Sequence, residues 1–452
     1  MVSREGPSGR KSGEGGEPTR ALVIVPWLTR IQRGEDDASP NRPRLSRAPE
    51  ARREEAAGLA RAIDLDVVDA QVVTLNDPRP ATLLGSGKVE DFAEQIDREK
   101  IELVVVDHAL TPVQQRNLEK EWKAKVLDRT GLILEIFGER ARTKEGVLQV
   151  DLAHLEYQKG RLVRSWTHLE RQRGGAGFLG GPGETQIESD RRLIQEKIIK
   201  LKRELETVRR TRELHRAKRR KVPFPVVAIV GYTNAGKSTL FNRLTGAEVL
   251  AENMLFATLD PTLRRLRLPH GTPVILSDTV GFISNLPTHL IAAFRATLEE
   301  VVEADLILHV RDISDPDTAA QAEDVEGILR DLGIEPANAK LIEVWNKIDA
   351  LPEDDRERLI AESQGEGAER PVAISAITGE GLSALTERIE RELAGELVDF
   401  TIRLSPDRLS RLQTVYETAD VVSRQDEEDG SVTLNLRGTR SARDDLEKLS
   451  AA

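Results

Sequence analysis

The stretch Gly231-Tyr-Thr-Asn-Ala-Gly-Lys-Ser238 decides the fold, because it stands between two segments of different periodicity. Residues 226–230 before it are continuously apolar, which is typical of a strand buried on both faces. Residues 239–245 after it carry apolar side chains at helical spacing. A strand, a glycine loop and a helix in this order predict a phosphate-binding P-loop, in which backbone N–H groups and the positive end of the helix dipole face phosphate oxygens.

The side chains of this loop predict how a nucleoside triphosphate is held. Lys237 would reach the β- and γ-phosphates, and the Ser238 hydroxyl would bind Mg²⁺. The predicted phosphate-binding set is the whole loop with the residue that follows it: Gly231, Tyr232, Thr233, Asn234, Ala235, Gly236, Lys237, Ser238 and Thr239.

A second motif, Asp278-Thr-Val-Gly281, follows the β-rich run 273–277. A carboxylate at the tip of a strand beside the P-loop would hold magnesium through water, so Asp278 is a predicted metal residue. Gly281 can bring its backbone N–H close to the γ-phosphate, and it joins Lys237 in the predicted catalytic set.

Two further strand ends predict guanine as the base. Residues 341–345 read as a strand ending in Asn346-Lys347-Ile348-Asp349, and a buried Asp349 carboxylate would accept hydrogen bonds from guanine N1–H and the 2-amino group. Adenine offers neither donor, so this carboxylate would be left unpaired by ATP. A backbone N–H at Ser375-Ala376, after the predicted strand 371–374, would meet guanine O6. Motifs in this order at the carboxyl ends of strands predict a GTPase.

The segment Phe256-Ala-Thr-Leu-Asp-Pro-Thr262 predicts the switch that responds to the γ-phosphate. Thr258 is the predicted switch threonine, and Thr262 is the alternative. Thr258 belongs to the predicted catalytic set and, with Ser238 and Asp278, to the predicted metal-binding set. Phe256 is counted among the nucleotide contacts. Phe282 stands where many GTPases carry a glutamine that orients the attacking water. A phenyl ring makes no such hydrogen bond, so slow hydrolysis by the isolated chain is expected, with acceleration by a partner or a metal ion.

Composition narrows the class of protein. The chain of 452 residues has room for several domains, and its lack of cysteine excludes disulfides, thiolate catalysis and cysteine-ligated zinc. The first 20 residues contain no apolar segment typical of a secretory signal, and no apolar run approaches the 18 or so residues that span a bilayer. We expect a soluble, cytoplasmic protein without a membrane span.

Charge is unevenly distributed. The net charge of −11 argues against nucleic acid, but basic residues outnumber acidic ones between residues 161 and 221, where the run Arg216-Ala-Lys-Arg-Arg-Lys221 ends the excess. Acidic residues gather instead between 299 and 369. The basic segment predicts either a surface for phosphate backbones or a solvated helix with ion pairs at three- and four-residue spacing. The sequence leaves both interpretations open.

The basic segment has a helical pattern over residues 151–173 and 187–220, which predicts an antiparallel hairpin. The loop between them, 174–184, is rich in glycine, so it is either a flexible tether or a backbone that approaches a ligand or RNA. The apolar stripe of the second helix is Leu193, Ile194, Ile198, Leu201, Leu205 and Val208. The RNA-contact candidates are Gly174, Gly175, Phe178, Leu179, Arg219 and Arg220.

The predicted fold class is α/β and multidomain. A disordered tail (1–20) precedes an N-terminal α/β domain (21–150) with alternating strands and helices, and the basic helical hairpin (151–221) follows. A doubly wound GTPase domain (222–397) and a small α+β C-terminal domain (398–452) complete the chain. Within the N-terminal domain, Gly85-Ser-Gly-Lys88 resembles part of a phosphate loop, but a turn that opens a helix at Val89 is the preferred interpretation.

Long motifs run from about residue 75 to residue 350. They are Gly85-Ser-Gly-Lys-Val89, Arg116-Asn-Leu-Glu119, Asp128-Arg-Thr-Gly-Leu-Ile-Leu134, Glu145-Gly-Val-Leu-Gln149, His168-Leu-Glu-Arg-Gln172, the glycine-rich loop, the P-loop, Phe256-Ala-Thr-Leu-Asp-Pro-Thr262 and Asp278-Thr-Val-Gly-Phe282. Together they resemble the HflX family, bacterial GTPases related to the Obg group. Two features depart from the family pattern: Lys159-Gly-Arg-Leu162 replaces Leu-Pro-Arg-Leu, and the segment from Val398 matches weakly.

The resemblance implies a function. Members of the family bind the large ribosomal subunit and separate stalled or idle ribosomes in the GTP state, with the hairpin directed toward the peptidyl-transferase centre and hydrolysis stimulated by the ribosome. It also implies Mg²⁺, and Asn234 matches a position that in related GTPases helps to coordinate K⁺. The expected partners are GTP or GDP and the large subunit with its RNA, with a monomer off the ribosome. An RNA-binding or assembly protein without splitting activity, and nucleotide chemistry in the N-terminal domain, are the alternatives.

Overall fold

The computed structural model describes residues 18–29, 48–172, 182–219, 224–247, 255–256, 258–259, 261–284, 295–335, 340–363, 370–394, 398–427 and 429–451. The chain divides into two compact units. The described residues of the first lie within Met1–Asp37, Pro49–Ile136 and Arg161–Ala176, and those of the second lie within Ala38–Ala48, Phe137–Gly160 and Gly177–Ala452. Across the described residues, no helix is both long enough and apolar enough to cross a bilayer.

The first unit is built on a four-stranded parallel sheet of order β2-β1-β3-β4. Its strands are β1 (Arg20–Leu28), β2 (Asp66–Leu75), β3 (Leu103–Val106) and β4 (Lys125–Asp128), and the helices between them are α1 (Pro49–Arg61), α2 (Ser86–Glu99) and α3 (Pro112–Trp122). Leu22 and Ile24 in β1 and Val104 in β3 are fully buried, because central parallel strands are covered on both faces. The predicted alternation of strand and helix is confirmed.

Gly85-Ser-Gly-Lys88 opens a helix, as preferred, but α2 begins at Ser86 and not at the predicted Val89, so Ser86, Gly87 and Lys88 form its first turn. Gly85 is the N-cap of α2 and has a φ of −67°, so its backbone does not need glycine. Lys88 is exposed and its Nζ lies 3.1 Å from Asp91 Oδ2, one helical turn further on. The lysine is therefore satisfied within α2 itself.

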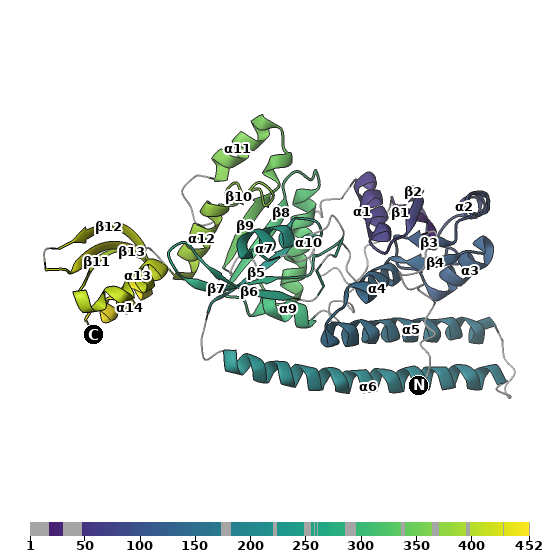
Figure 1. The fold of residues 1–452 in the computed structure, drawn as a ribbon. Helices are drawn as coiled ribbons and strands as arrows, with labels where there is room; N and C mark the ends of the chain where they lie inside the picture. Colours follow the sequence, from purple (N-terminus) through teal and green to yellow (C-terminus); the bar gives the residue numbers. More distant parts are fainter. Residues whose placement is uncertain are drawn as a thin grey trace. The chain divides into compact units, whose positions relative to one another are not determined.

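Three helices follow the first sheet: α4 (Arg129–Arg140), α5 (Lys144–Gln172) and α6 (Pro182–Arg219). Over its first part, α5 runs antiparallel to α6, because Lys159 contacts Gln195 at 2.6 Å whereas the earlier Glu156 contacts the later Lys202 at 2.9 Å (Figure 1). α5 continues through Gly160 without a break.

The apolar stripe of α6 is confirmed except at one position. Ile198 and Leu205 are buried, whereas Leu193 is 50 % exposed and the prediction that it belongs to the stripe is wrong. Consecutive helical residues point about 100° apart, so the residue before Ile194 lies off the face that packs on α5.

The second unit contains a six-stranded sheet of order β10-β9-β8-β5-β7-β6. Its strands are β5 (Val226–Gly231), β6 (Thr262–Arg267), β7 (Pro273–Asp278), β8 (Leu306–Asp312), β9 (Leu341–Asn346) and β10 (Val372–Ala373). The described helices are α7 (Lys237–Thr245), α9 (Arg295–Val302), α10 (Thr318–Asp331), the 3₁₀ turn η1 (Ile348–Ala350), α11 (Glu353–Ser363) and α12 (Leu382–Ala394). All neighbouring strands are parallel except β6, which pairs antiparallel with β7 at the edge.

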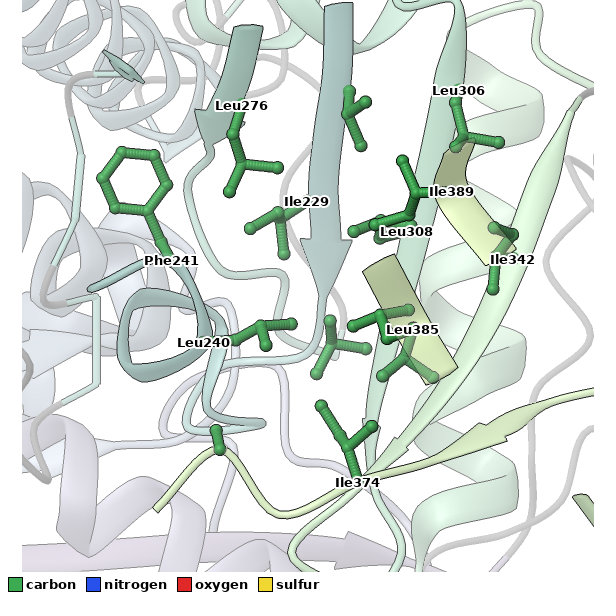
Figure 2. Close-up of a cluster of buried hydrophobic side chains, with 14 of the residues drawn as sticks. Ile229, Leu240, Phe241, Leu276, Leu306, Leu308, Ile342, Ile374, Leu385 and Ile389 are labelled. Atoms are coloured by element: carbon green, nitrogen blue, oxygen red, sulfur yellow. The ribbon is translucent and has the colours of Figure 1, made fainter. Parts of the chain in front are cut away.

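The core of this sheet positions the P-loop. Ile229 of β5 and Leu308 of β8 pack with Leu240 and Phe241 of α7 and with Leu276 of β7, and all five side chains are fully buried (Figure 2). The packing fixes the start of α7 against the end of β5, so the loop between them has both ends anchored. The predicted doubly wound sheet is confirmed.

A small antiparallel sheet of order β11-β13-β12 ends the chain. It contains β11 (Val398–Leu404), β12 (Asp420–Asp426) and β13 (Val432–Gly438), with η2 (Pro406–Arg411), α13 (Leu412–Thr418) and α14 (Arg440–Ala451). Leu404 and Leu434 pack with Val415 and Leu446 on its covered face. The α+β class predicted for this segment is confirmed.

Candidate nucleotide site

The P-loop backbone requires glycine at two places. Gly231 ends β5 with a φ of +154°, and a Cβ there would lie 2.2 Å from the carbonyl oxygen of Val310. Gly236 precedes α7 with a φ of +89°, and a Cβ there would lie 2.2 Å from Nδ2 of Asn346. Left-handed backbone and close approach together exclude larger residues. The predicted order of strand, glycine loop and helix is thus present, and the N-terminus of α7 opens directly from the loop.

Lys237 is the buried cation of this loop. Its Nζ donates a hydrogen bond to the carbonyl oxygen of Tyr232 at 2.7 Å. Burial lowers the pKa of Lys237 to about 8, an effect that the negative charge of Asp278 opposes and the positive charge of Lys347 reinforces. A desolvated ammonium next to the helix N-terminus is a place where an anion would be strongly favoured.

The three predicted metal residues meet at one point. Asp278 Oδ2 accepts hydrogen bonds from Ser238 Oγ at 2.8 Å and from Thr258 Oγ1 at 2.9 Å, and the two hydroxyl oxygens are 2.9 Å apart. Burial raises the pKa of Asp278, against the hydrogen bonds from both hydroxyls and the charge of Lys237. Its other oxygen, Oδ1, is buried and has no hydrogen-bond partner in the described part of the chain. Hydroxyl and carboxylate oxygens are the ligands that Mg²⁺ accepts, so these residues fit that ion.

Thr258, and not the alternative Thr262, brings its hydroxyl to Asp278. Thr262 starts β6, where it pairs with Asp278 through the backbone register of the two strands. Its side chain is only partly buried.

The segment after Asp278 is held against the P-loop by hydrogen bonds. The N–H of Phe282 donates to the carbonyl of Gly231 at 3.1 Å, and the N–H of Thr233 donates to the carbonyl of Phe282 at 2.7 Å. The N–H of Ser284 donates to the Tyr232 hydroxyl oxygen at 2.7 Å. This role of Tyr232 was not predicted, because nothing local in the sequence indicates which backbone group a loop tyrosine reaches.

The predicted base-binding residues come together around Asn346. Its Nδ2 donates to the carbonyl of Ala235 at 2.8 Å, and its Oδ1 accepts from the N–H of Ala376 at 3.0 Å. Lys347 pairs with Asp312 at 2.7 Å and has a left-handed backbone. Ser375 is buried beside this loop.

One premise of the base prediction is wrong. Asp349 lies in η1 and is exposed, not buried, because it points out of the short 3₁₀ turn whose Ile348 fills the core. Discrimination by its carboxylate would therefore depend on a bound base to exclude water from it.

Most of the predicted RNA-contact residues lie outside the part of the chain that the structure describes. Gly174, Gly175, Phe178, Leu179 and Arg220 lie outside the described residues. Arg219 is the last residue of α6, and its side chain is outside them as well. All six remain predictions.

Fold and site together define a class of protein. A mainly parallel sheet carries a glycine loop between β5 and α7, and the Asn-Lys-Ile-Asp motif begins at the end of β9. A hydroxyl–carboxylate cluster joins the start of α7, the segment before β6 and the end of β7. This is the architecture of the P-loop GTPases.

Comparison with known proteins narrows the class to a family. Four family models match in succession: "GTP-binding GTPase N-terminal" over residues 50–138, "GTP-binding GTPase Middle Region" over 140–219, "50S ribosome-binding GTPase" over 226–347 and "HflX C-terminal domain" over 361–450. The GTPase HflX of Magnetococcus marinus is 51 % identical over 376 residues, which cover 83 % of this chain and 85 % of the relative. The GTPase HflX of Escherichia coli K12 is 46 % identical over 360 residues, 80 % and 83 % of the two chains. The chain belongs to the HflX family of GTPases.

Among solved structures, a GTP-binding protein from Sulfolobus solfataricus in complex with GDP is 23 % identical and aligns over 83 % of this chain and 98 % of its own, with a TM-score of 0.43. As a member of the HflX family, this chain is a GTP-binding GTP hydrolase. The expectation that the segment from Val398 departs from the family is wrong, since the C-terminal family model covers 361–450. The fold of that segment depends on alternating buried positions of a small sheet, such as Leu434 and Leu436, and not on a short sequence motif.

Proposed function

We propose that this GTPase binds the large ribosomal subunit and, in its GTP state, splits or remodels stalled or idle ribosomes. The name "50S ribosome-binding GTPase" of the family model over residues 226–347 supports the partner. A ribosomal partner implies a cytoplasmic location, and we take the free protein to be a monomer.

The geometry of the site supports a specific set of nucleotide contacts. Lys237 and the loop N–H groups would hold the β- and γ-phosphates, and Ser238, Thr258 and Asp278 would hold Mg²⁺, which neutralises charge on those phosphates. The N–H of Gly281 would meet the γ-phosphate. The contacts assigned to the base are Asn346, Lys347, Asp349, Ser375 and Ala376, and Phe256 of the switch segment is counted as a further nucleotide contact.

One observation carries the proposal that nucleotide controls the helical arm formed by α5 and α6. The ring of Phe256, two residues before Thr258, meets the ring of Phe137 edge to face, with centroids 4.7 Å apart at an angle of 78°. Both rings are buried, and Phe256 is held in a left-handed conformation with a φ of +59°. A non-glycine residue in that conformation persists only where its surroundings favour it.

Phe137 lies in the last turn of α4, directly before the arm. The next residue, Gly138, faces α5: a Cβ on it would lie 3.9 Å from His154 Nε2. A rearrangement of Thr258 around Mg²⁺ and the γ-phosphate would thus displace Phe256 and, through Phe137, the start of the arm. Arg209 of α6 adds a second attachment through its ion pair with Glu299 of α9, at 2.7 Å.

The arm offers a basic surface. Among the described side chains of α6, Arg191, Arg192, Lys197 and Arg203 are exposed and make no ion pair. Lys200, Lys202 and Arg210 are paired with glutamates, so the solvated-helix interpretation accounts for part of the charge only. Unpaired cations along one helix favour binding to an RNA phosphate backbone.

Sedimentation of ribosomes tests the proposal. With GTP carrying a non-hydrolysable β–γ bond, the wild-type protein should convert whole ribosomes into subunits, and with GDP it should not. Phe137→Leu, which changes the partner of Phe256 that is not assigned to the nucleotide, should bind GTP but separate fewer ribosomes, because the edge-to-face contact with Phe256 is lost. Phe92→Leu, from the Phe92–Trp122 pair of the first sheet, is the matched control and should act like wild type. An unchanged ribosome profile with the wild-type protein would refute the splitting role.

The alternative is an RNA-binding or assembly protein whose GTP site only regulates docking. The unpaired cations of α6 favour it equally, because none of them touches the nucleotide site. Lys237→Ala separates the two: a pure binder keeps its ribosome association without nucleotide, whereas a splitting factor loses its effect.

Potassium is a further part of the proposal. Asn234 is exposed in the P-loop with a left-handed backbone, at the position that related GTPases use for K⁺. Hydrolysis should then be faster in KCl than in NaCl at equal ionic strength, and equal rates would remove Asn234 from this role.

A further inference from the structure

Thr233, the third residue of the P-loop, carries a hydroxyl without a partner. The residue is 6 % exposed, and its Oγ1 is buried with no hydrogen-bond partner in the described part of the chain. Buried hydroxyls in folded proteins are nearly always hydrogen-bonded, since an unmet one costs on the order of 1–3 kcal/mol. The backbone N–H of the same threonine donates a hydrogen bond to the carbonyl of Phe282.

The neighbours of Thr233 are the groups that face the reacting end of the nucleotide. A Cβ built on Gly281 would lie 2.8 Å from Thr233 Cγ2 and 3.1 Å from Lys237 Nζ. The threonine side chain therefore stands beside the lysine and against the glycine whose N–H is assigned to the γ-phosphate. A rotation of roughly 120° about χ1 moves the hydroxyl into the position that the methyl group holds and the methyl group into that of the hydrogen, so the hydroxyl can reach that side of the loop.

Phe282 cannot orient the attacking water. Its ring is 1 % exposed, its N–H donates to Gly231 and its carbonyl accepts from Thr233. The side chain has no hydrogen-bonding group, and the backbone N–H and carbonyl are each already engaged with the P-loop. Phe282 therefore cannot replace the glutamine that orients the attacking water at this position in other GTPases.

We propose that the Thr233 hydroxyl is a catalytic group of GTP hydrolysis and performs the task for which Phe282 is unsuited. A hydroxyl both donates and accepts, so Thr233 can accept a hydrogen bond from the attacking water while donating one to a γ-phosphate oxygen. The water oxygen forms the new bond to γ-phosphorus, the bond to the bridging oxygen of GDP breaks, and the water proton passes to phosphate. Threonine stays neutral throughout. The inference rests on the proposed nucleotide contacts.

The test replaces only the hydroxyl. Thr233→Val is nearly isosteric, and single-turnover hydrolysis by the full chain should fall about 10²-fold, the usual cost of losing one transition-state hydrogen bond. Affinities for GTP and GDP should stay within about threefold, whereas binding of GDP with aluminium fluoride should weaken in parallel with the rate. Thr233→Ser, which restores the hydroxyl, should recover most of both.

Thr245→Val is the matched control. Its hydroxyl lies at the other end of α7 and donates to the carbonyl of Phe241 at 2.7 Å, so hydrolysis should be unaffected. Wild-type turnover in Thr233→Val would overturn the proposal. So would an equal loss of GTP and GDP affinity without a selective loss of the aluminium fluoride complex, which would make the hydroxyl a support of the loop. Failure of the wild-type chain to bind GTP would overturn the nucleotide site itself, and this inference with it.

Discussion

The first sheet and the mainly parallel second sheet both have buried charged side chains near the carboxyl ends of their strands, but the charges are partnered differently. In the first sheet, Asp107 follows β3 and Arg129 follows β4, and they form a direct ion pair. Arg129 also contacts Glu55 at 2.6 Å, and Asp107 contacts Arg52 at 3.2 Å. Burial alone would lower the pKa of Arg129, but the two carboxylates raise it above its ordinary value.

In the second sheet, the buried cation Lys237 makes no direct ion pair with any residue that the structure describes. Lys237 donates to a neutral carbonyl, its pKa is lowered, and the nearby Asp278 is hydrogen-bonded by two hydroxyls. Asp278 Oδ1 and Thr233 Oγ1 are left without partners among the described residues. The comparison teaches how to separate a structural cluster from a binding site: the first satisfies its own charges, whereas the second keeps capacity for a ligand.

Breaking the ion-pair cluster of Arg52, Glu55, Asp107 and Arg129 should have the largest effect on stability. Arg129→Met removes the cation between the Asp107 and Glu55 carboxylates and leaves Asp107 with its ion pair to Arg52, and we expect the free energy of unfolding to fall by about 3–5 kcal/mol. Denaturant unfolding followed by hydrogen exchange in β3 and β4 measures it. Lys88→Met removes an exposed pair with Asp91 and should cost less than about 1 kcal/mol. Equal effects of the two substitutions would contradict the distinction drawn here.

Removing Lys237, the cation of the nucleotide site, should weaken ligand binding without lowering the stability of the fold. Lys237→Ala should weaken GTP binding by about 10²–10³-fold, because the phosphates lose a buried charge-assisted contact. Without nucleotide, the midpoint of thermal unfolding should stay unchanged or rise, since a desolvated ammonium is removed. Titration with a fluorescent GTP analogue and a melting curve provide both values. A large drop in the ligand-free midpoint would show Lys237 to be structural like Arg129.

The lowered pKa of Lys237 predicts a pH dependence of binding. Bound phosphates favour the ammonium, whereas the free site loses the proton as the pH rises through about 8. GTP affinity should therefore be flat from about pH 7 to pH 8 and then fall by up to about tenfold per pH unit. Lys237→Arg should remain flat, because a guanidinium does not titrate in this range. A wild-type affinity that is constant to about pH 9.5 would refute the burial argument.

The smallest effect should come from a substitution in Gly85-Ser-Gly-Lys88, the segment at the start of α2 that resembles part of a phosphate loop. Gly87 lies in α2, and a Cβ there would meet nothing within 4 Å. Gly87→Ala should raise the free energy of unfolding by about 0.5–1 kcal/mol through helix propensity, without changing GTP affinity. Thermal unfolding and nucleotide titration of the same sample decide it, and weaker GTP binding would make this loop part of a nucleotide site after all.

Much of the fold and of the site could be predicted from the sequence because chemistry restricts the residue type locally. Gly231 and Gly236 are required by backbone conformation and close approach, and Lys237 and Asp278 by charge. The continuous apolar run of β5 and the stripe of α6 follow from periodicity. In each case the information lies within a few residues of the feature.

What could not be predicted depends on contacts between distant segments. The exposure of Asp349 is set by how η1 sits on the core, and the off-stripe position of Leu193 by the way α6 packs on α5. The Phe137–Phe256 contact joins a helix end to a switch segment more than a hundred residues later. No periodicity or motif encodes such a pair, because an aromatic residue in either place is equally consistent with an ordinary core position.

The two hydrogen bonds of Asn346 make one rigid piece of the P-loop and the Ser375-Ala376 loop. The distance from the phosphate end to the base end of the cradle is consequently set during folding, before any nucleotide arrives. If a guanine nucleotide binds with the contacts proposed above, one with a shorter phosphate chain would fill the base end and leave the place of the γ-phosphate to water.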